Sequence, residues 1–279
     1  MKLTQTEKWL AIGLMVLPGL LALPPCTRAQ SPGPAAAQLK MGADLSGVYY
    51  PSTARDTLGA ATPDNPGQQF VWLDDSGKPI PFPKNLLTEW GKERLARNHP
   101  SGENAAGQTT TAYDSDDPDF ACFPAGVPRV YLFLYPMQIL NTKDGVMMVF
   151  EYGHNIRQIF TDGRGHAQDQ EPTWMGDSIG HWEGDTLVVE TTNQNDRTWL
   201  GYGGQPHSDQ LKVEERMRKT DAGTLLIDIT LIDPKAYTAP LHTRKKYILK
   251  PSWNLKEYVC EDNMINFRPF EKQTSTQSK

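Results

Sequence analysis

Five residues, Gly176-Asp177-Ser178-Ile179-Gly180, have the G-x-S-x-G spacing that marks the nucleophilic serine of many hydrolases. In those enzymes the serine stands on a sharp turn between a buried strand and a helix. Here the residues before the motif are polar, and the run 186–192 after it is rich in β-branched residues, which predicts another strand. We therefore interpret Ser178 as an ordinary strand residue and keep a serine hydrolase as a third hypothesis.

Two histidines in polar loops are better candidates for proton transfer. His166 follows an Arg-Gly pair, and His207 lies between a proline and a serine. An imidazole can gain or lose a proton near neutral pH, and a loop on a β scaffold gives it access to a ligand. We predict that both histidines act as general acids or bases. The alternative is that each is a solvated surface histidine.

Carboxylates on apolar strand faces could be the partners of these histidines. Strand alternation places Glu190 and Glu151 on faces that otherwise carry mainly apolar residues. Burial without a partner is costly for a carboxylate and raises its pKa, which suits a general acid or base. The alternative is a structural ion pair with an arginine, for which Arg157, Arg164 and Arg216 are available.

Aromatic residues near these histidines in the sequence indicate a pocket for a small ligand. A largely apolar cavity with a few polar groups is typical of sites for small, partly hydrophobic molecules. In such a pocket Arg157 or Arg164 would bind a ligand carboxylate through two hydrogen bonds. The aromatic residues expected to bind the ligand are Tyr152, Trp174, Trp182 and Trp199, although each could be ordinary core or rim.

The sequence predicts no metal and no cofactor. The six histidines form no H-x-x-x-H or H-E-x-x-H pair, and no glycine-rich loop leads from a strand into a helix. The net charge is -5 and there is no basic stripe, which gives no electrostatic reason to expect nucleic acid as a partner.

Two functions fit these residues. The first is a cofactor-independent acid–base enzyme acting on a small aromatic or hydrophobic molecule, either a lyase that decarboxylates or eliminates, or an isomerase. Its catalytic residues would be His166, His207, Glu190 and Glu151. The alternative is a protein that binds a hydrophobic ligand without turnover. Only the enzyme needs a histidine, an arginine and a carboxylate to converge on one cavity.

The elements that must position these residues are mainly β-strands. Apolar runs separated by turn signals predict β structure over 45–50, 128–140, 144–160, 186–192, 211–218, 224–232, 242–249 and 253–260. One helix is predicted over 85–98, with Asn85 as its N-cap. Gly184 is available for a positive φ in a hairpin turn. We therefore expect one domain, 44–267, built as an antiparallel, closed or partly closed β-barrel with long N-terminal loops.

The first 29 residues have the pattern of a secretory signal peptide. Two lysines accompany the apolar run 9–25, and Ala29 is a small residue at the expected cleavage position. Lipidation at Cys26 is the alternative. We expect a periplasmic or secreted protein with no membrane segment after cleavage, a flexible leader over 30–43 and a flexible tail over 268–279.

Cleavage of the signal would leave two cysteines, Cys122 and Cys260. An even pair in an oxidising compartment predicts a disulfide. The bridge would close a loop of about 140 residues, which the chain-entropy account makes worth on the order of 5 kcal/mol. The alternative is two separate buried thiols.

Three stretches form a longer pattern: Asp162 to His166, the run PTWMGDSIGHWEGDTLVVETT over 172–192, and Glu257 to Asn263. Together with the residues between them they resemble a large family of secreted bacterial proteins whose members are mainly uncharacterised. The resemblance covers roughly residues 118–263. It implies a β-rich, lipocalin-like domain outside the cytoplasm, and it implies no reaction and no catalytic residues.

Overall fold

The computed structural model describes residues 43–52, 70–100, 102–103, 109–110 and 115–265. The predicted signal peptide and tail, and all but the last residue of the leader, lie outside the described residues. Within them the chain is mainly β. None of the described helices is long and apolar enough to cross a membrane.

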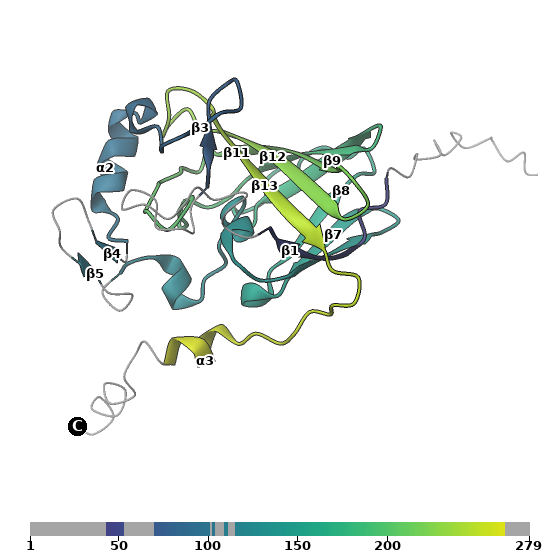
Figure 1. Ribbon diagram of the computed structural model, residues 1–279. Helices are drawn as coiled ribbons and strands as arrows, with labels where there is room; N and C mark the ends of the chain where they lie inside the picture. The colour runs from purple at the N-terminus through teal and green to yellow at the C-terminus, as the bar shows by residue number, and fades with distance from the viewer. Residues whose placement is uncertain (1–42, 53–69, 101, 104–108, 111–114, 266–279) are drawn as a thin grey trace, which may run out of the picture. The chain divides into compact units, whose positions relative to one another are not determined.

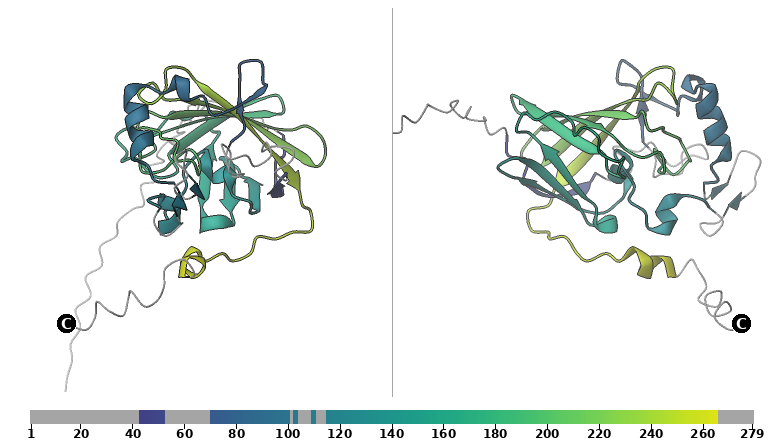
Figure 2. Two further views of the ribbon diagram at one scale, coloured as in Figure 1. Left: turned by 60° about the vertical axis from the view of Figure 1, so that its left-hand side comes forward. Right: turned by 180° about the vertical axis from the view of Figure 1, so that it is seen from behind.

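Nine strands close into a barrel, in which each strand pairs with the next and β13 pairs back with β1 (Figure 1). The second view in Figure 2 shows the long strands curving around one interior from the opposite side. In order around the barrel these strands are β1 (Gly47–Pro51), β6 (Met137–Asn141), β7 (Gly145–Phe150), β8 (Ile156–Phe160), β9 (Asp177–Glu183), β10 (Thr186–Thr192), β11 (Lys212–Lys219), β12 (Thr224–Ile232) and β13 (Leu241–Leu249).

The predicted closed barrel is confirmed, but it is mixed rather than purely antiparallel. β8 and β9 run parallel and pair at only two positions, Ile159 with Ser178 and Phe160 with Ile179. Parallel neighbours cannot be joined by a tight turn, so residues 161–176 form a longer crossover between them. Alternation in a sequence shows which residues share a face but not which way a strand runs.

Side chains fill the barrel interior. Along β12 every second residue is buried, from Leu225 through Ile227 and Ile229 to Leu231. The 3-10 helix η3 (Arg129–Leu132) adds Tyr131, whose ring contacts Phe150 and Tyr247. This interior is the hydrophobic core that holds the barrel wall rigid.

Shorter elements extend or pack against the barrel. β2 pairs with β13 and with β3, whereas β4 and β5 form a separate pair. The predicted hairpin turn is confirmed, with φ of +59° at Gly184 between β9 and β10. The remaining elements are β2 (Trp72–Leu73), β3 (Pro79–Ile80), η1 (Lys84–Leu86), α2 (Glu89–Arg97), β4 (Gly102–Glu103), β5 (Thr109–Thr110), η2 (Pro118–Ala121), η4 (Tyr152–His154) and α3 (Cys260–Ile265).

Four of the predicted elements need correction. The helix predicted over 85–98 begins at Glu89, and its N-cap is Thr88, whose Oγ1 accepts from the Gly91 N–H at 3.1 Å. Residues 129–132 of the β region predicted over 128–140 form η3, and η4 divides the β region predicted over 144–160 into β7 and β8. Residues 253–260 contain no strand and instead lead into α3. Residues 253–260 have the composition of a strand, but a segment of this kind forms a strand only where the edge of a neighbouring strand is available for pairing.

A disulfide joins Cys122 to Cys260, across a sequence separation of 138 residues. It connects the end of η2 to the first residue of α3. Beside it, the Tyr258 N–H donates to Nε2 of His154, and the Lys256 N–H donates to Glu151. The bridge therefore fixes the segment after β13 next to η2 and η4, where few backbone hydrogen bonds would hold it.

Replacing both cysteines by serine should lower the free energy of unfolding by about 2–5 kcal/mol, because the unfolded chain regains the freedom that a long closed loop removes. The measurement is urea denaturation with and without dithiothreitol. Reductant should bring the native protein to the stability of the double variant and leave the variant unchanged. Equal stability of the oxidised protein and the variant would contradict a stabilising bridge.

Candidate functional site

His166 in the crossover lies between two carboxylates from neighbouring strands. Its Nδ1 is 2.8 Å from Oδ2 of Asp177 on β9, and its Nε2 is 3.1 Å from Oε1 of Glu190 on β10. Lys212 on β11 extends the chain, with its Nζ 3.2 Å from the other oxygen of Glu190. The structure thus brings together two of the predicted catalytic residues, His166 and Glu190.

Local turn chemistry positions the histidine. The backbone N–H of Arg164 donates to the Asp162 carboxylate, and Gly163 takes a φ of +84°. This tight turn reverses the chain after β8. The Ala167 N–H then donates to Asp177 Oδ2 at 3.0 Å, so the same oxygen holds both the backbone and the ring of the crossover.

The two carboxylates that contact His166 differ in how many of their oxygens already accept hydrogen bonds. Burial alone would raise the pKa of Glu190, but hydrogen bonds from Lys212 and His166 outweigh it and lower the pKa below its ordinary value. Asp177 uses only Oδ2, and no described residue donates to its Oδ1. A carboxylate oxygen with free lone pairs can accept a proton from a ligand.

Two pockets lie beside the carboxylates that contact His166, and His166 itself lines neither of them. The first, which we name the wall pocket, has a volume of about 540 Å³ and is bordered by Arg157, Phe160, Arg164, Met175, Asp177 and Ser178. The second, the outer pocket, has a volume of about 570 Å³ and includes Arg164, Ile179, His181, Val188, Glu190 and Arg216. Both volumes suit a small molecule. Asp177 borders the first pocket, Glu190 borders the second, and His166 connects the two carboxylates.

Arg157, predicted to bind a ligand carboxylate, is instead buried in the barrel interior. Its guanidinium forms a two-pronged ion pair with Glu215 and also donates to Tyr131. Its Nη2 donates to Thr191 at 2.7 Å and its Nε to Ser178 at 3.1 Å. All five N–H groups are therefore used, and none is left for a ligand. Arg164, in a half-exposed ion pair with Asp162, keeps the predicted capacity to bind an anion.

Ser178 is a buried residue of β9, as predicted, and not the apex of a nucleophile elbow. Its Oγ contacts Arg157 and, at 2.9 Å, Thr191. Among the described residues no histidine or carboxylate lies within hydrogen-bond distance of this oxygen. A nucleophilic serine needs such a base, so the geometry does not fit a serine hydrolase.

The other two predicted catalytic residues lie elsewhere. His207 is fully buried, with Nε2 2.7 Å from the Thr198 hydroxyl and Nδ1 3.1 Å from the Ser208 carbonyl. Burial lowers its pKa, which favours a neutral, packed ring. Glu151 accepts from the backbone N–H of Lys256. Neither side chain borders the wall pocket or the outer pocket.

The four predicted ligand-binding aromatic residues are dispersed. Trp174 stacks on Phe123 with ring centroids 4.9 Å apart, and Trp182 packs against the core. Trp199 lies 6.0 Å from the guanidinium carbon of Arg129. Tyr152 contacts none of these and belongs to a second polar cluster. None of the four borders either pocket. Their positions fit the alternative given above, in which they are ordinary core and rim residues.

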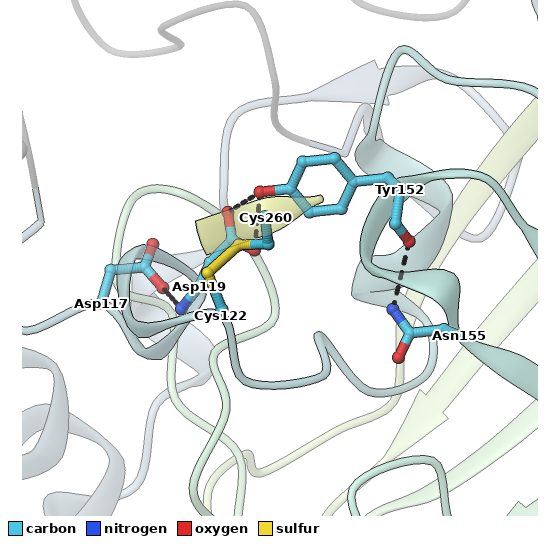
Figure 3. The surroundings of a disulfide bond; sticks show 6 residues. All are labelled: Asp117, Asp119, Cys122, Tyr152, Asn155 and Cys260. Atoms are coloured by element: carbon cyan, nitrogen blue, oxygen red, sulfur yellow. Dashed lines mark hydrogen bonds between the residues drawn. A yellow bond between two sulfur atoms is a disulfide. The ribbon is translucent and has the colours of Figure 1, made fainter. Parts of the chain in front are cut away.

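That second cluster surrounds Asp119, which the sequence did not indicate. The Tyr152 hydroxyl lies 3.0 Å from each Asp119 oxygen, beside the disulfide (Figure 3). Arg129 forms a two-pronged ion pair with Asp117, at 2.8 and 2.6 Å. Burial raises the pKa of Asp119 to about 6, even though the nearby Arg129 charge lowers it. Asp117 adds to the rise because it carries a like charge.

Comparison with models of protein families, with curated proteins and with solved structures found no match to the chain. Within the part of the chain that the structure describes, no group of three or more His, Cys, Asp or Glu side chains is arranged to hold a metal ion.

Glu215→Gln should destabilise the protein by about 3–5 kcal/mol, because it leaves the buried Arg157 charge without a compensating charge. The matched control is Glu214→Gln on the same strand, where the 44 %-exposed side chain pairs with Lys212 and the cost should stay below about 1 kcal/mol. Chemical denaturation of both variants measures the difference. Similar costs for the two would show that the buried pair contributes no more than a surface pair.

Asp119→Asn should change how stability depends on pH. The folded state raises this pKa from 3.8 to about 6, so it binds the proton more tightly than the unfolded state. Stability from this group is present at low pH and is lost as pH rises from about 4 to about 6. The variant should therefore gain up to about 3 kcal/mol relative to the native protein between pH 4 and pH 7. Urea denaturation across that range tests this, and parallel curves would contradict it.

Proposed function

We propose that the protein is a cofactor-independent acid–base enzyme, a lyase or an isomerase, that acts on a small molecule bound in the wall pocket. The observation that carries the proposal is the hydrogen-bonded chain Asp177–His166–Glu190, which runs from the wall pocket to the outer pocket. A carboxylate that orients an imidazole is a common feature of proton transfer in enzymes. Here a second carboxylate, that of Glu190, faces the other ring nitrogen and can accept the proton.

Each residue then has a separate part. Asp177 Oδ1, which accepts from no described residue, takes a proton from the bound molecule. His166 carries the proton from its Nδ1 side to its Nε2 side, and Glu190 with Lys212 accepts it beside the outer pocket. Arg164 borders both pockets and supplies a positive charge for an anionic group of the substrate. Water screens the half-exposed pair of Arg164 with Asp162, which makes the pair weak, so a ligand can replace it.

The same geometry favours an enzyme over a carrier of hydrophobic ligands. Arg164 borders both pockets, Asp177 and Glu190 each border one, and His166, which borders neither, joins the two carboxylates. A carrier would not require such a hydrogen-bonded chain. The barrel interior is occupied by apolar side chains and by the Arg157–Glu215–Tyr131 network. We also propose that the protein works outside the cytoplasm, where an oxidising compartment would favour the Cys122–Cys260 disulfide.

His166→Asn should lower turnover by about 10²–10⁴-fold, because asparagine cannot relay a proton between the two carboxylates. The assay incubates the oxidised protein with a panel of aromatic and aliphatic acids, ketones and esters, with and without a chelator. Mass spectrometry and NMR follow loss of carbon dioxide, elimination or isomerisation. The expected result is turnover that the chelator leaves unchanged.

The matched control is His242→Asn, because His242 lies on β13 beside the Thr230 hydroxyl and contacts neither Asp177 nor Glu190. It should keep native turnover. Full activity of the His166 variant, or an equal loss in the control, would overturn the proposal. Retention of an intact ligand with no product would favour the carrier instead.

A further inference from the structure

Two buried polar residues, Arg157 and Ser178, are among those that line the wall pocket, and we call them its floor; they are only 2 % and 3 % exposed. The floor exists because β8 and β9 pair at only two positions, which leaves room between the start of β8 and the start of β9. A ligand in this pocket would therefore lie next to two residues whose side chains belong to the barrel interior. The inference drawn from this floor rests on the proposed function, since it concerns the same pocket.

A count of hydrogens at this floor leaves one donor without an acceptor. Arg157 donates to both the Ser178 and the Thr191 hydroxyls, and these two oxygens are 2.9 Å apart. The two hydroxyls carry two hydrogens, but only one can lie between them. Neither oxygen contacts any other acceptor among the described residues. One O–H group is therefore left over.

The surplus hydrogen belongs on Ser178. Thr191 is fully buried and borders neither pocket, so an unpaired O–H there would cost about 1–3 kcal/mol. If Thr191 donates to Ser178 instead, the Ser178 hydrogen is free to point into the wall pocket, where a ligand or water can accept it. The protein interior thus favours one orientation of the pair.

Arg157 also determines the chemical character of this hydroxyl. A guanidinium that donates to Oγ withdraws electron density from it, which makes the O–H a stronger donor and the oxygen a weaker nucleophile. A strong donor fixed in a buried site stabilises negative charge that develops on a bound oxygen. Asp177 is the residue before Ser178 on β9 and borders the same pocket, and its Oδ1 accepts from no described residue.

We propose that Ser178 donates its hydrogen bond to the carbonyl oxygen of the substrate, and that the substrate is a small carbonyl compound with a C–H bond next to the carbonyl. Asp177 removes that hydrogen as a proton. The electron pair of the C–H bond then forms a carbon–carbon double bond, and the carbonyl electrons become the charge on oxygen that Ser178 stabilises. Where a further carbon–carbon double bond is conjugated with the new one, the proton returns to its far carbon while the charge on oxygen re-forms the carbonyl, which completes an isomerisation. Where the carbon next to the deprotonated one carries a leaving group, that group departs with its bonding electron pair while the carbonyl re-forms, which completes an elimination. Ile156, Phe160 and Met175 give the pocket an apolar wall for the body of the molecule.

The first test uses 4-nitrophenolate, a planar oxyanion whose absorbance reports its binding and ionisation. It should bind at least tenfold more tightly than 4-nitrotoluene, which has the same ring without the oxygen. Ser178→Ala should weaken 4-nitrophenolate binding at least tenfold. Thr191→Val keeps the Ser178 hydrogen and should bind within threefold of the native protein. Thermal melting checks that each variant is folded.

Equal binding of the two probes by the native protein would overturn the assignment of Ser178, and this comparison needs no variant. Equal losses of 4-nitrophenolate affinity in Ser178→Ala and Thr191→Val would also overturn it. Such a result would show that binding depends on the whole hydrogen-bond network and not on the Ser178 hydroxyl in particular. Native affinity in Ser178→Ala would do the same.

The second test measures exchange of the hydrogens of 2-tetralone next to its carbonyl, in D₂O by NMR. The native protein should accelerate exchange, and Ser178→Ala and His166→Asn should each slow it at least tenfold. His166→Asn should still bind 4-nitrophenolate. Full exchange in Ser178→Ala would overturn the donor while the proposed acid–base function stands. If the native protein does not accelerate exchange but binds 4-nitrophenolate through Ser178, the proposed acid–base function and the carbonyl substrate class are both overturned. The assignment of Ser178 as a hydrogen-bond donor would then still stand.

Discussion

One guanidinium inside the barrel connects the elements on which the candidate site depends. Arg157 on β8 bonds to Ser178 on β9, Thr191 on β10, Glu215 on β11 and Tyr131 of η3. A buried charge of this kind is tolerated only when every donor has a partner, and here all five do. Because β8 and β9 share only two paired positions, the bond from Arg157 to Ser178 crosses the place where their backbone pairing is weakest. The network thus joins β8 to β9 beside the wall pocket, where few backbone hydrogen bonds connect the two strands.

The crossover that carries His166 follows from the same local topology. A parallel pair needs a long connection, and residues 161–176 pass over the outer side of β9 and β10 before β9 begins. His166 reaches Asp177 and Glu190 because these residues point outward from two adjacent antiparallel strands. The predicted antiparallel barrel requires no crossover at this point, and the parallel pairing of β8 and β9 is what carries residues 161–176 across these strands.

The sequence predicted much of the barrel and part of the site. Strict alternation in β12 and β13, and the turn at Gly184, fixed those strands and their inward faces without further information. His166 and Glu190 were recognised by residue type, and their contact required the crossover. Glu215 had a signal that went unused, since it alternates with two apolar residues, Val213 and Met217, on β11. Asp177 had none, because a carboxylate at the start of a strand looks the same whether it faces solvent or a histidine.

Two carboxylates show why an altered pKa does not by itself mark a catalytic residue. Asp119 has a pKa raised to about 6, a value that suits acid–base catalysis, but Tyr152 covers both of its oxygens and it borders neither pocket. Its environment is that of a structural clamp beside the disulfide. Asp177 has one free oxygen, a histidine on the other and a pocket in front of it. The same reasoning applies to Ser178, whose motif suggests a nucleophile: its oxygen faces a guanidinium and a hydroxyl rather than a base, so its chemistry is to donate a hydrogen bond.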